Sequence, residues 1–257
     1  MLWIEEEPET VAWNPYARQM DYMSPQAQGL TRFFPLNEGT AYDFSVNNKN
    51  GIANNTQLIP NAINGKCLSF NGTNSYIETY YVLPSTNFSF GGFFETNGNF
   101  GSNNRLMGNA DATTGLNGIS VLIGYTGSNK IYTVIRGGSG HDIGSTATNL
   151  SAGVHHYFVT MSSVSGTKIF YDGRIIDIDA SVLNMATVYP FRIGRDGNGV
   201  TAFSGKIWDV KIFNRPLSER EVMNLYLNAQ DIWSPELLFL TTNRFKPWFA
   251  CPSPVWD

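Results

Sequence analysis

The 257-residue sequence has few of the features that mark proteins bound to membranes or nucleic acids. It has no run of about 18 or more apolar residues, the length that a membrane-spanning helix needs. Its start, MLWIEEEPET, lacks the basic-then-apolar order of a signal peptide. Charged residues make up only 15% of the chain and form no basic field that could hold nucleic acid. We therefore expect neither a membrane nor a nucleic acid as a partner, and no secretion by a signal peptide.

Cysteine and histidine are also scarce. The two cysteines, Cys67 and Cys251, lie far apart, and without an export signal we expect free thiols rather than a disulfide. Two cysteines and three histidines spread along the chain do not have the spacing of a structural zinc site. The sequence therefore predicts no required cofactor.

Short apolar segments separated by turn residues are abundant. Between about Gly29 and Asn228, segments such as ISVLIGY and HHYFVTM alternate with clusters of Gly, Asn, Ser and Asp. Strands spaced by about eight to twelve residues are typical of antiparallel sandwiches and barrels. We predict one all-β domain over residues 29–229, with extended arms at residues 1–28 and 230–257.

One short helix is expected near the end of this domain. Ser218 and Glu221 have the Ser-x-x-Glu spacing of a capping box. Val222, Leu225 and Tyr226 follow at i, i+3 and i+4, which gives one narrow apolar stripe. A helix of about three turns is marginal alone. We therefore expect it to lie against the sandwich.

The strand before the helix, KIWDVKIF, predicts two different faces. Alternation places Trp208, Val210 and Ile212 on one face and Asp209 and Lys211 on the other. The first face is expected to be fully buried.

Five segments, taken in order, resemble one known family. FSGKIWDVKIFNRPLSEREVMNLY is similar to the closing strand, R-A/P-L-S turn and short helix of laminin-G-like, concanavalin A-like domains. Earlier strands of that family resemble GLTRFFPLNEGTAYDFSVNNKNGIANN, NGKCLSFNGTNSYIET, GVHHYFVTMSSVSGTKIFYDGRII and FRIGRDG. The resemblance covers about 200 residues. It implies a two-sheet antiparallel jelly-roll sandwich with one short C-terminal helix.

The two arms lie outside this resemblance. The first is acidic and aromatic, and the second is rich in aromatic residues and proline. For the first arm the alternatives are a solvated tail and docking onto another protein, and its aromatic residues favour docking. Aromatic side chains exposed in such number would promote aggregation, so we expect the second arm to pack back on the sandwich or to be buried in an assembly. The residues predicted to bind a partner are Trp3, Trp13, Tyr16, Trp233, Trp248 and Trp256.

The layout of the chain also resembles small structural proteins of tailed phages, in which a laminin-G-like domain precedes a short aromatic tail. This resemblance implies a virion protein, assembled in the host cytoplasm and anchored by its ends to other virion proteins or to further copies of itself. A capsid decoration or head protein is the first interpretation, and a tail or baseplate component is the next. The alternative is a carbohydrate-binding adhesin module that contacts a cell-surface glycan. A glycoside hydrolase is the third.

No group of residues has the pattern of a catalytic site. Asp177 and Asp179 lie two apart on a predicted strand, but the E-x-D-x-x-E motif of the sandwich glucanases is missing. The adjacent His155 and His156 would point to opposite faces of a strand. His141 has no serine or cysteine partner at a motif spacing. We therefore expect no enzymatic activity.

A structural calcium ion is the one metal predicted. The loop DFSVNNKNG offers several oxygen ligands, which calcium prefers. The resemblance implies that Asp43, in this loop, and Asp209, in the final strand, hold the ion. Asn71 and Asn74 stand where the family usually has acids, so we expect weak binding.

Overall fold

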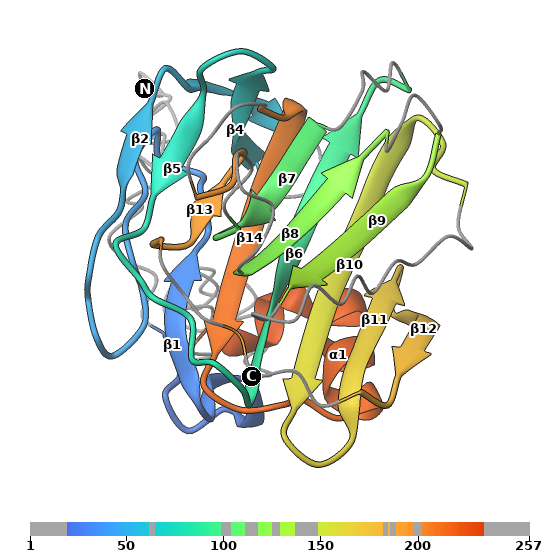
Figure 1. Cartoon of the computed structure of the whole chain (residues 1–257). Helices are drawn as coiled ribbons and strands as arrows, with labels where there is room; N and C mark the ends of the chain where they lie inside the picture. Colours follow the sequence, from blue (N-terminus) through green and yellow to red (C-terminus); the bar gives the residue numbers. More distant parts are fainter. Residues whose placement is uncertain are drawn as a thin grey trace, which may run out of the picture.

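The structure is a computed structural model that describes residues 20–61, 65–98, 104–110, 118–124, 129–136, 149–181, 185, 189–197 and 202–233. Two antiparallel sheets, one of eight strands and one of six, lie face to face (Figure 1). A single α-helix lies behind the larger sheet in this view (Figure 1). The predicted all-β sandwich with one helix is confirmed.

The eight-stranded sheet runs, in spatial order, through β12 (Arg174–Asp179), β11 (Gly166–Tyr171), β10 (Gly153–Ser162), β6 (Phe88–Thr96), β14 (Ser204–Phe213), β4 (Gly65–Asn71) and β3 (Gln57–Asn61). Its last member, β1 (Leu30–Phe34), pairs with the second half of β14. The six-stranded sheet runs through β2 (Ile52–Asn54), β5 (Tyr76–Glu78), β13 (Arg192–Ile193), β7 (Asn104–Gly108), β8 (Gly118–Ile123) and β9 (Ile131–Arg136). The helix is α1 (Glu219–Leu227), and two short 3-10 helices are η2 (Pro25–Ala27) and η4 (Ala229–Ile232).

The main core fills the space between the sheets. In β10, Tyr157, Val159 and Met161 belong to this core, whereas Phe158 between them belongs to a second cluster on the outer face. This alternation is the two-residue period of a strand. Because both faces of the eight-stranded sheet are apolar here, the outer face also needs a cover.

Strand β14 departs from simple alternation at Asp209. Its φ of 55° and a register shift between Trp208 and Lys211 mark a β-bulge. Val210 and Ile212 belong to the main core, but Trp208 joins a cluster on the outer face. The prediction that these three side chains share a face is therefore wrong for Trp208, because the extra residue of a bulge reverses the alternation.

The helix α1 provides the cover for the outer face. Val222 and Leu225 pack in one cluster with Phe158, Phe170 and Phe213 of the sheet. The predicted capping box is present at the start of the helix. No helix in the described part of the chain is long and apolar enough to span a membrane.

The packed body reaches beyond both predicted domain boundaries. Met20 forms a β-bridge with Trp233, and Asp21 N donates a 2.9 Å hydrogen bond to Ile232 O. Gln26 Nε2 donates to the carbonyl of Asn228 at 3.0 Å. Both ends contribute apolar side chains to the cluster under α1. Residues 20–28 and 230–233, which were assigned to the arms, therefore contain side chains that pack on the body.

A second, smaller cluster lies beside the first on the outer face. It contains Cys67, Phe93 and Trp208, with the rings of Phe93 and Trp208 stacked at 5.8 Å. The thiol of Cys67 is free, as predicted, and burial raises its pKa. Cys251 lies outside the described residues.

Candidate functional site

The hairpin of β11 and β12 turns at Asp172 and Gly173. Their φ angles of 48° and 75° are both positive, as the two-residue turn favoured in hairpins requires. A Cβ atom on Gly173 would lie 2.7 Å from Tyr226 Cδ1 and 2.9 Å from Met223 Sδ, both on α1. Glycine therefore lets the turn approach the helix closely.

The surface is hollowed where this hairpin meets the helix. A groove of about 540 Å³ lies there, a size typical of ligand sites. Most of its lining is apolar or aromatic, with one acid and one base. The lining residues are Tyr171, Asp172, Arg174, Ile175, Ile176, Met223, Tyr226 and Leu227.

Both tyrosines of the groove are held by neighbouring rings. Tyr171 stacks on His155 at 4.9 Å, and its hydroxyl lies 2.6 Å from His155 Nδ1. Tyr226 stacks on Phe93 at 6.3 Å. Burial raises the pKa of Tyr171, so its hydroxyl stays protonated and can donate. The groove thus has two aromatic walls in fixed positions.

Asp172 ties the hairpin to β10. Its Oδ1 accepts a 2.8 Å hydrogen bond from His156 N, and its Oδ2 lies 3.1 Å from His155 Nδ1. Its own backbone N–H donates to the carbonyl of His156 at 2.8 Å. The acid at the rim of the groove is therefore also a structural residue.

Ser151, His155 and Asp172 include the residue types of a hydrolase triad and lie in contact with one another. His155 Nε2 lies 3.4 Å from Ser151 Oγ but only 3.2 Å from the carbonyl oxygen of Ser151. His155 Nδ1 lies 3.1 Å from Asp172 Oδ2, and the donor and acceptor roles of both ring nitrogens depend on the tautomer of His155. We interpret these contacts as a network that fixes the hairpin on β10.

The other acids considered for catalysis lie outside the groove. Asp177 Oδ1 accepts from Ile178 N at 2.9 Å, and Asp179 Oδ1 accepts from Ser181 N at 2.7 Å. Both lie on β12, the edge strand, and neither lines the groove. His141 lies outside the described residues.

Asp43 organises the loop in which calcium was predicted. Its Oδ1 accepts from Phe33 N and Ser45 N, each at 2.9 Å. Its Oδ2 accepts from Lys49 N at 2.9 Å and from the Ser45 hydroxyl at 3.0 Å. Arg32 Nε lies 3.7 Å from the same oxygen. Four hydrogen bonds and one nearby arginine therefore surround this carboxylate.

Asp209, the second predicted calcium ligand, has a buried cation beside it. Lys211 Nζ lies 2.5 Å from Asp209 Oδ2 and 4.6 Å from the ring centroid of Phe33. Burial raises the pKa of Asp209, and Lys211 opposes this. The described residues contain no group of three or more His, Cys, Asp or Glu side chains that could hold a metal. The calcium site stays a prediction.

Only one of the six residues predicted to bind a partner falls in the described structure. Trp233 lies 5.2 Å from the ring of Phe33 and 5.4 Å from that of Phe44, in the cluster under α1. It therefore packs on the body of the domain. The other five, Trp3, Trp13, Tyr16, Trp248 and Trp256, lie outside the described residues.

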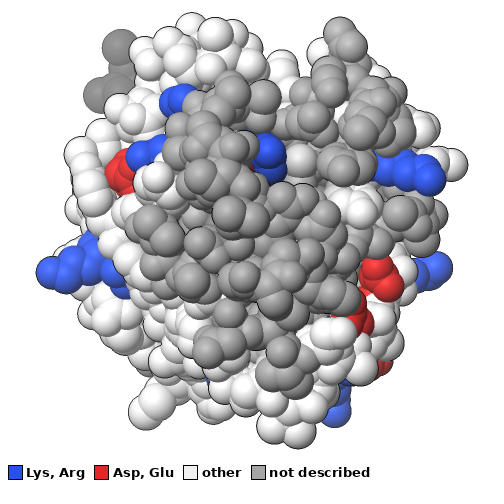
Figure 2. All heavy atoms as spheres, viewed as in Figure 1, with Lys and Arg blue, Asp and Glu red and all other residues white. Residues whose placement is uncertain are grey.

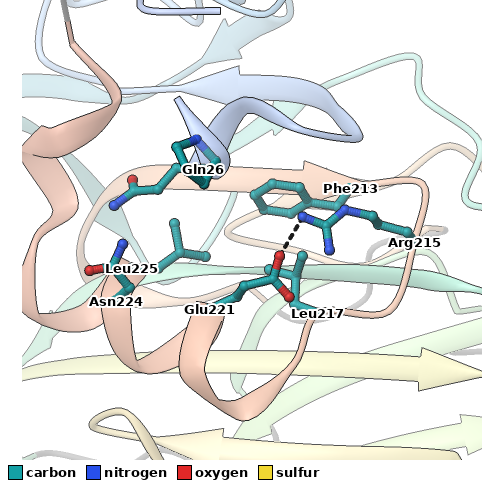
Figure 3. A pocket seen from close by; sticks show the side chains of 8 residues that line it. Gln26, Phe213, Arg215, Leu217, Glu221, Asn224 and Leu225 are labelled. Atoms are coloured by element: carbon teal, nitrogen blue, oxygen red, sulfur yellow. Dashed lines mark hydrogen bonds and ion pairs between the residues drawn. The ribbon is translucent and has the colours of Figure 1, made fainter. Parts of the chain in front are cut away.

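A second hollow, between η2, the end of β14 and α1, is much smaller. Its volume is about 30 Å³, enough for a water molecule or two but not for a sugar ring. Arg215 Nη2 lies 2.6 Å from Glu221 Oε1 there (Figure 3). Burial alone would raise the pKa of Glu221, but hydrogen bonds from Arg215 and Ser218 outweigh it and lower the pKa to about 2.

Tyr76, on the six-stranded sheet, has two arginines close to its ring. Arg192 Cζ and Arg195 Cζ each lie 5.2 Å from the centroid of its ring. Arg192 Nε also pairs with Glu78 at 2.7 Å. The described Lys and Arg side chains visible in Figure 2 lie apart from one another, with Asp and Glu between some of them. The described part of this view therefore has no continuous basic field.

Three solved structures similar to this chain share its fold at low sequence identity. Domain 4 of AbnA, a GH43 extracellular arabinanase from Geobacillus stearothermophilus, in complex with arabinotriose, has a TM-score of 0.64 and 15% identity, covering 77% of this chain and 98% of that one. The binding domain of Paraclostridial Mosquitocidal Protein 1 has a TM-score of 0.62 and 16% identity. The match covers 78% of this chain and 52% of that one. The receptor binding domain of botulinum neurotoxin D has a TM-score of 0.57 and 13% identity. The match covers 78% of this chain and 53% of that one. The chain thus spans nearly all of the first and about half of the other two.

No curated protein matches the chain. A family model does match it, over residues 71–223, which is more than half of its length. The matched range includes the β11–β12 hairpin and most of the strands of both sheets. The chain therefore belongs to the concanavalin A-like lectin/glucanases superfamily.

Proposed function

We propose that this protein is a non-enzymatic carbohydrate-binding protein and that the groove between the β11–β12 hairpin and α1 holds the saccharide. The observation that carries the proposal is the lining of the groove. Tyr171 and Tyr226 offer apolar ring faces with polar tips, and Asp172 and Arg174 supply an acceptor and donors at the rim. Such a mixture suits a ligand with apolar C–H faces and many hydroxyl groups.

The rigidity of the groove also supports binding. His155 holds one tyrosine by stacking and by a hydrogen bond, and Phe93 holds the other by stacking. Side chains that are already fixed lose little conformational entropy when a ligand arrives. A weak polar ligand such as a sugar gains most from this arrangement.

The same groove favours binding without cleavage. Canonical glycoside hydrolysis uses two carboxyl groups on either side of the scissile bond. Among the eight lining residues, Asp172 is the one acid, and both of its oxygens already contact β10. We therefore propose that the protein is not an enzyme.

The comparison with the arabinanase domain suggests the first ligand to test. That domain was solved with arabinotriose, and this chain matches nearly its whole length. An arabino-oligosaccharide is therefore a suitable starting probe, within a wider panel of neutral and acidic polysaccharides.

We further propose that the ends of the chain attach this domain to a phage particle, as a capsid decoration or head protein, with a tail or baseplate component as the alternative. Four of the six tryptophans, Trp3, Trp13, Trp248 and Trp256, lie within 20 residues of one end of the sequence. Burial of apolar area in a partner contributes about 25 cal/mol per Å². Aromatic residues at both ends of the chain support such an anchor.

The carbohydrate proposal is tested on immobilised polysaccharides with the full chain. Tyr226→Ala should weaken binding by about tenfold or more, since a central aromatic contact is worth at least about 1.4 kcal/mol. Tyr80→Ala is the matched control, because Tyr80 is 60% exposed and does not line the groove. Melting curves establish that both variants are folded.

Two results would contradict the proposal. Unchanged binding by a folded Tyr226→Ala variant would remove the groove as the site. Release of reducing ends by the purified protein would show that it is an enzyme.

A further inference from the structure

Strand β12 forms one edge of the eight-stranded sheet. It pairs with β11 on one side, and no described strand pairs with its other side. An open edge presents backbone donors and acceptors that can pair with another chain. Natural sheets usually protect such edges against pairing with another chain. The side chains of β12 therefore indicate whether this edge is protected or is available for pairing.

Three of the other edge strands, β1, β2 and β3, carry protective features. Strand β3 contains Pro60, which cannot donate to a ladder, and β2 is only three residues long. Strand β1 is covered by the loop after it, from which Asn47 Nδ2 donates to the carbonyl of Thr31 at 2.9 Å. Strand β12 has six residues and no proline. It carries three charged residues and a bulge at Ile176, and its Ile178 side chain is 56% exposed.

The outer positions of β12, Arg174–Asp179 (RIIDID), are complementary to one another when two copies run antiparallel. In the register centred between Ile176 and Asp177, Arg174 lies opposite Asp179 of a second copy, and Ile175 lies opposite Ile178. The central pair, Ile176 opposite Asp177 at the bulge, is not complementary. Because the pairing is two-fold symmetric, each of these contacts occurs twice. A parallel pairing in register would instead place arginine beside arginine and acid beside acid, which is unfavourable.

We propose that the protein forms a homodimer in which β12 of each copy pairs with β12 of the other and the two eight-stranded sheets become continuous. Arg174 is exposed and has no ion-pair partner in the described part of its own chain. The dimer gives it an acid and covers the exposed Ile178. This inference does not rest on the carbohydrate proposal.

The test is the oligomeric state of the full chain, measured by sedimentation velocity together with light scattering. We expect a dimer for the wild-type protein. Asp179→Arg and Arg174→Asp each place like charges opposite one another, and each should raise the dimer dissociation constant about tenfold or more. The double variant Arg174→Asp/Asp179→Arg restores opposite charges and should restore the dimer.

Two further variants complete the test. Arg220→Asp, on the exposed surface of α1, is the matched control and should remain dimeric. Ile178→Lys should give a monomer because it removes the apolar contact between Ile175 and Ile178 of the two copies. This variant is used in place of Asp179→Arg if the circular dichroism spectrum shows that Asp179→Arg is unfolded.

Three results would overturn the dimer. The first is a wild-type protein that is monomeric at about 100 μM. The second is a folded Asp179→Arg or Ile178→Lys variant that is still a dimer. The third is a folded double variant that stays monomeric. None of these readouts uses a sugar. Failure of the dimer is thus distinguishable from failure of glycan binding.

Discussion

His156 is buried on the outer face of the eight-stranded sheet, among aromatic rings. The ring centroids of Phe93, Phe158 and Tyr226 lie 4.7, 5.6 and 5.7 Å from its own. Its Nδ1 has no hydrogen-bond partner within the described structure. Burial, and secondarily the charge of Lys211, lowers its pKa from 6.5 to about 3. His156 is therefore neutral in the folded protein near pH 7.

The buried histidine should make the protein sensitive to acid. Between pH 6.5 and about 3 the unfolded state binds one more proton than the folded state, so stability falls as the pH falls through this window. The slope is at most about 1.4 kcal/mol per pH unit. Between pH 7 and pH 4.5, the wild-type protein should lose about 2–3 kcal/mol more than His156→Phe in urea unfolding. Equal losses in the two proteins would show that His156 does not carry this sensitivity.

Calcium binding at Asp43 and Asp209 would have to compete with protein contacts. An ion at Asp209 must compete with the Lys211 ammonium, and an ion at Asp43 must compete with several hydrogen-bond donors. The prediction is that saturating calcium raises the melting temperature by mass action and that Asp209→Asn abolishes the rise. Superimposable melting curves in calcium and in chelator would remove the site.

Sequence reasoning at this scale succeeded where the pattern is local. The rings of His155 and His156 contact different partners, Phe94 and Phe93 respectively, as adjacent residues on a strand should. The groove was not foreseen, because Tyr171 and Tyr226 come from separate elements and meet only through the tertiary fold. The Y-D-G turn after the H-H strand was a signal that could have pointed to it.

The helix α1 begins at a complete capping box, and its stability should depend on pH. Glu221 Oε2 accepts from Ser218 N at 2.8 Å, and Ser218 Oγ accepts from Glu221 N at 3.3 Å. The folded pKa of Glu221 is about 2, below its ordinary 4.5, so its contribution is present above pH 4.5 and is lost as the pH falls toward 2.

Glu221→Gln should therefore lower the free energy of unfolding most near neutral pH. The side chain of Glu221 is 37% exposed, so screening by solvent limits the effect to about 1 kcal/mol. The difference between Glu221→Gln and wild type in urea unfolding should shrink from pH 6 to pH 3. A difference that is the same at both pH values would mean that the carboxylate charge is not involved.

Elements with local signals were predicted well, and elements that depend on distant pairing were not. Ser218 and Glu221 lie within one turn, so the helix start could be read directly. The bulge at Asp209 depends on how β14 lies between β6 and its other neighbours, and alternation alone does not show it.

The described body includes residues at both ends of the range 20–233, and this determines how truncations should behave. A chain of residues 20–233 keeps Met20 and Ile232 in the cluster under α1, whereas a chain of residues 29–229 loses both. We expect the shorter chain to be less stable by about 2 kcal/mol or more, because buried apolar side chains are removed. Equal urea midpoints and slopes for the two chains would show that the added segments contribute nothing.

The same longer truncation tests the proposed anchor. Residues 20–233 should fold but fail to join the particle, because Trp3, Trp13, Trp248 and Trp256 are missing. Sedimentation of particles assembled beside this truncated body, followed by staining for the domain, measures incorporation. Normal incorporation would show that the sandwich itself makes the contact.

Amide hydrogen–deuterium exchange of the full chain, with and without the best-binding saccharide, tests the central claim most directly. The account predicts slower exchange at residues 171–176, in the hairpin, and at residues 223–227, in the last turns of α1. Protection confined to the surface around Tyr76, Arg192 and Arg195, with no change in the groove, would contradict it.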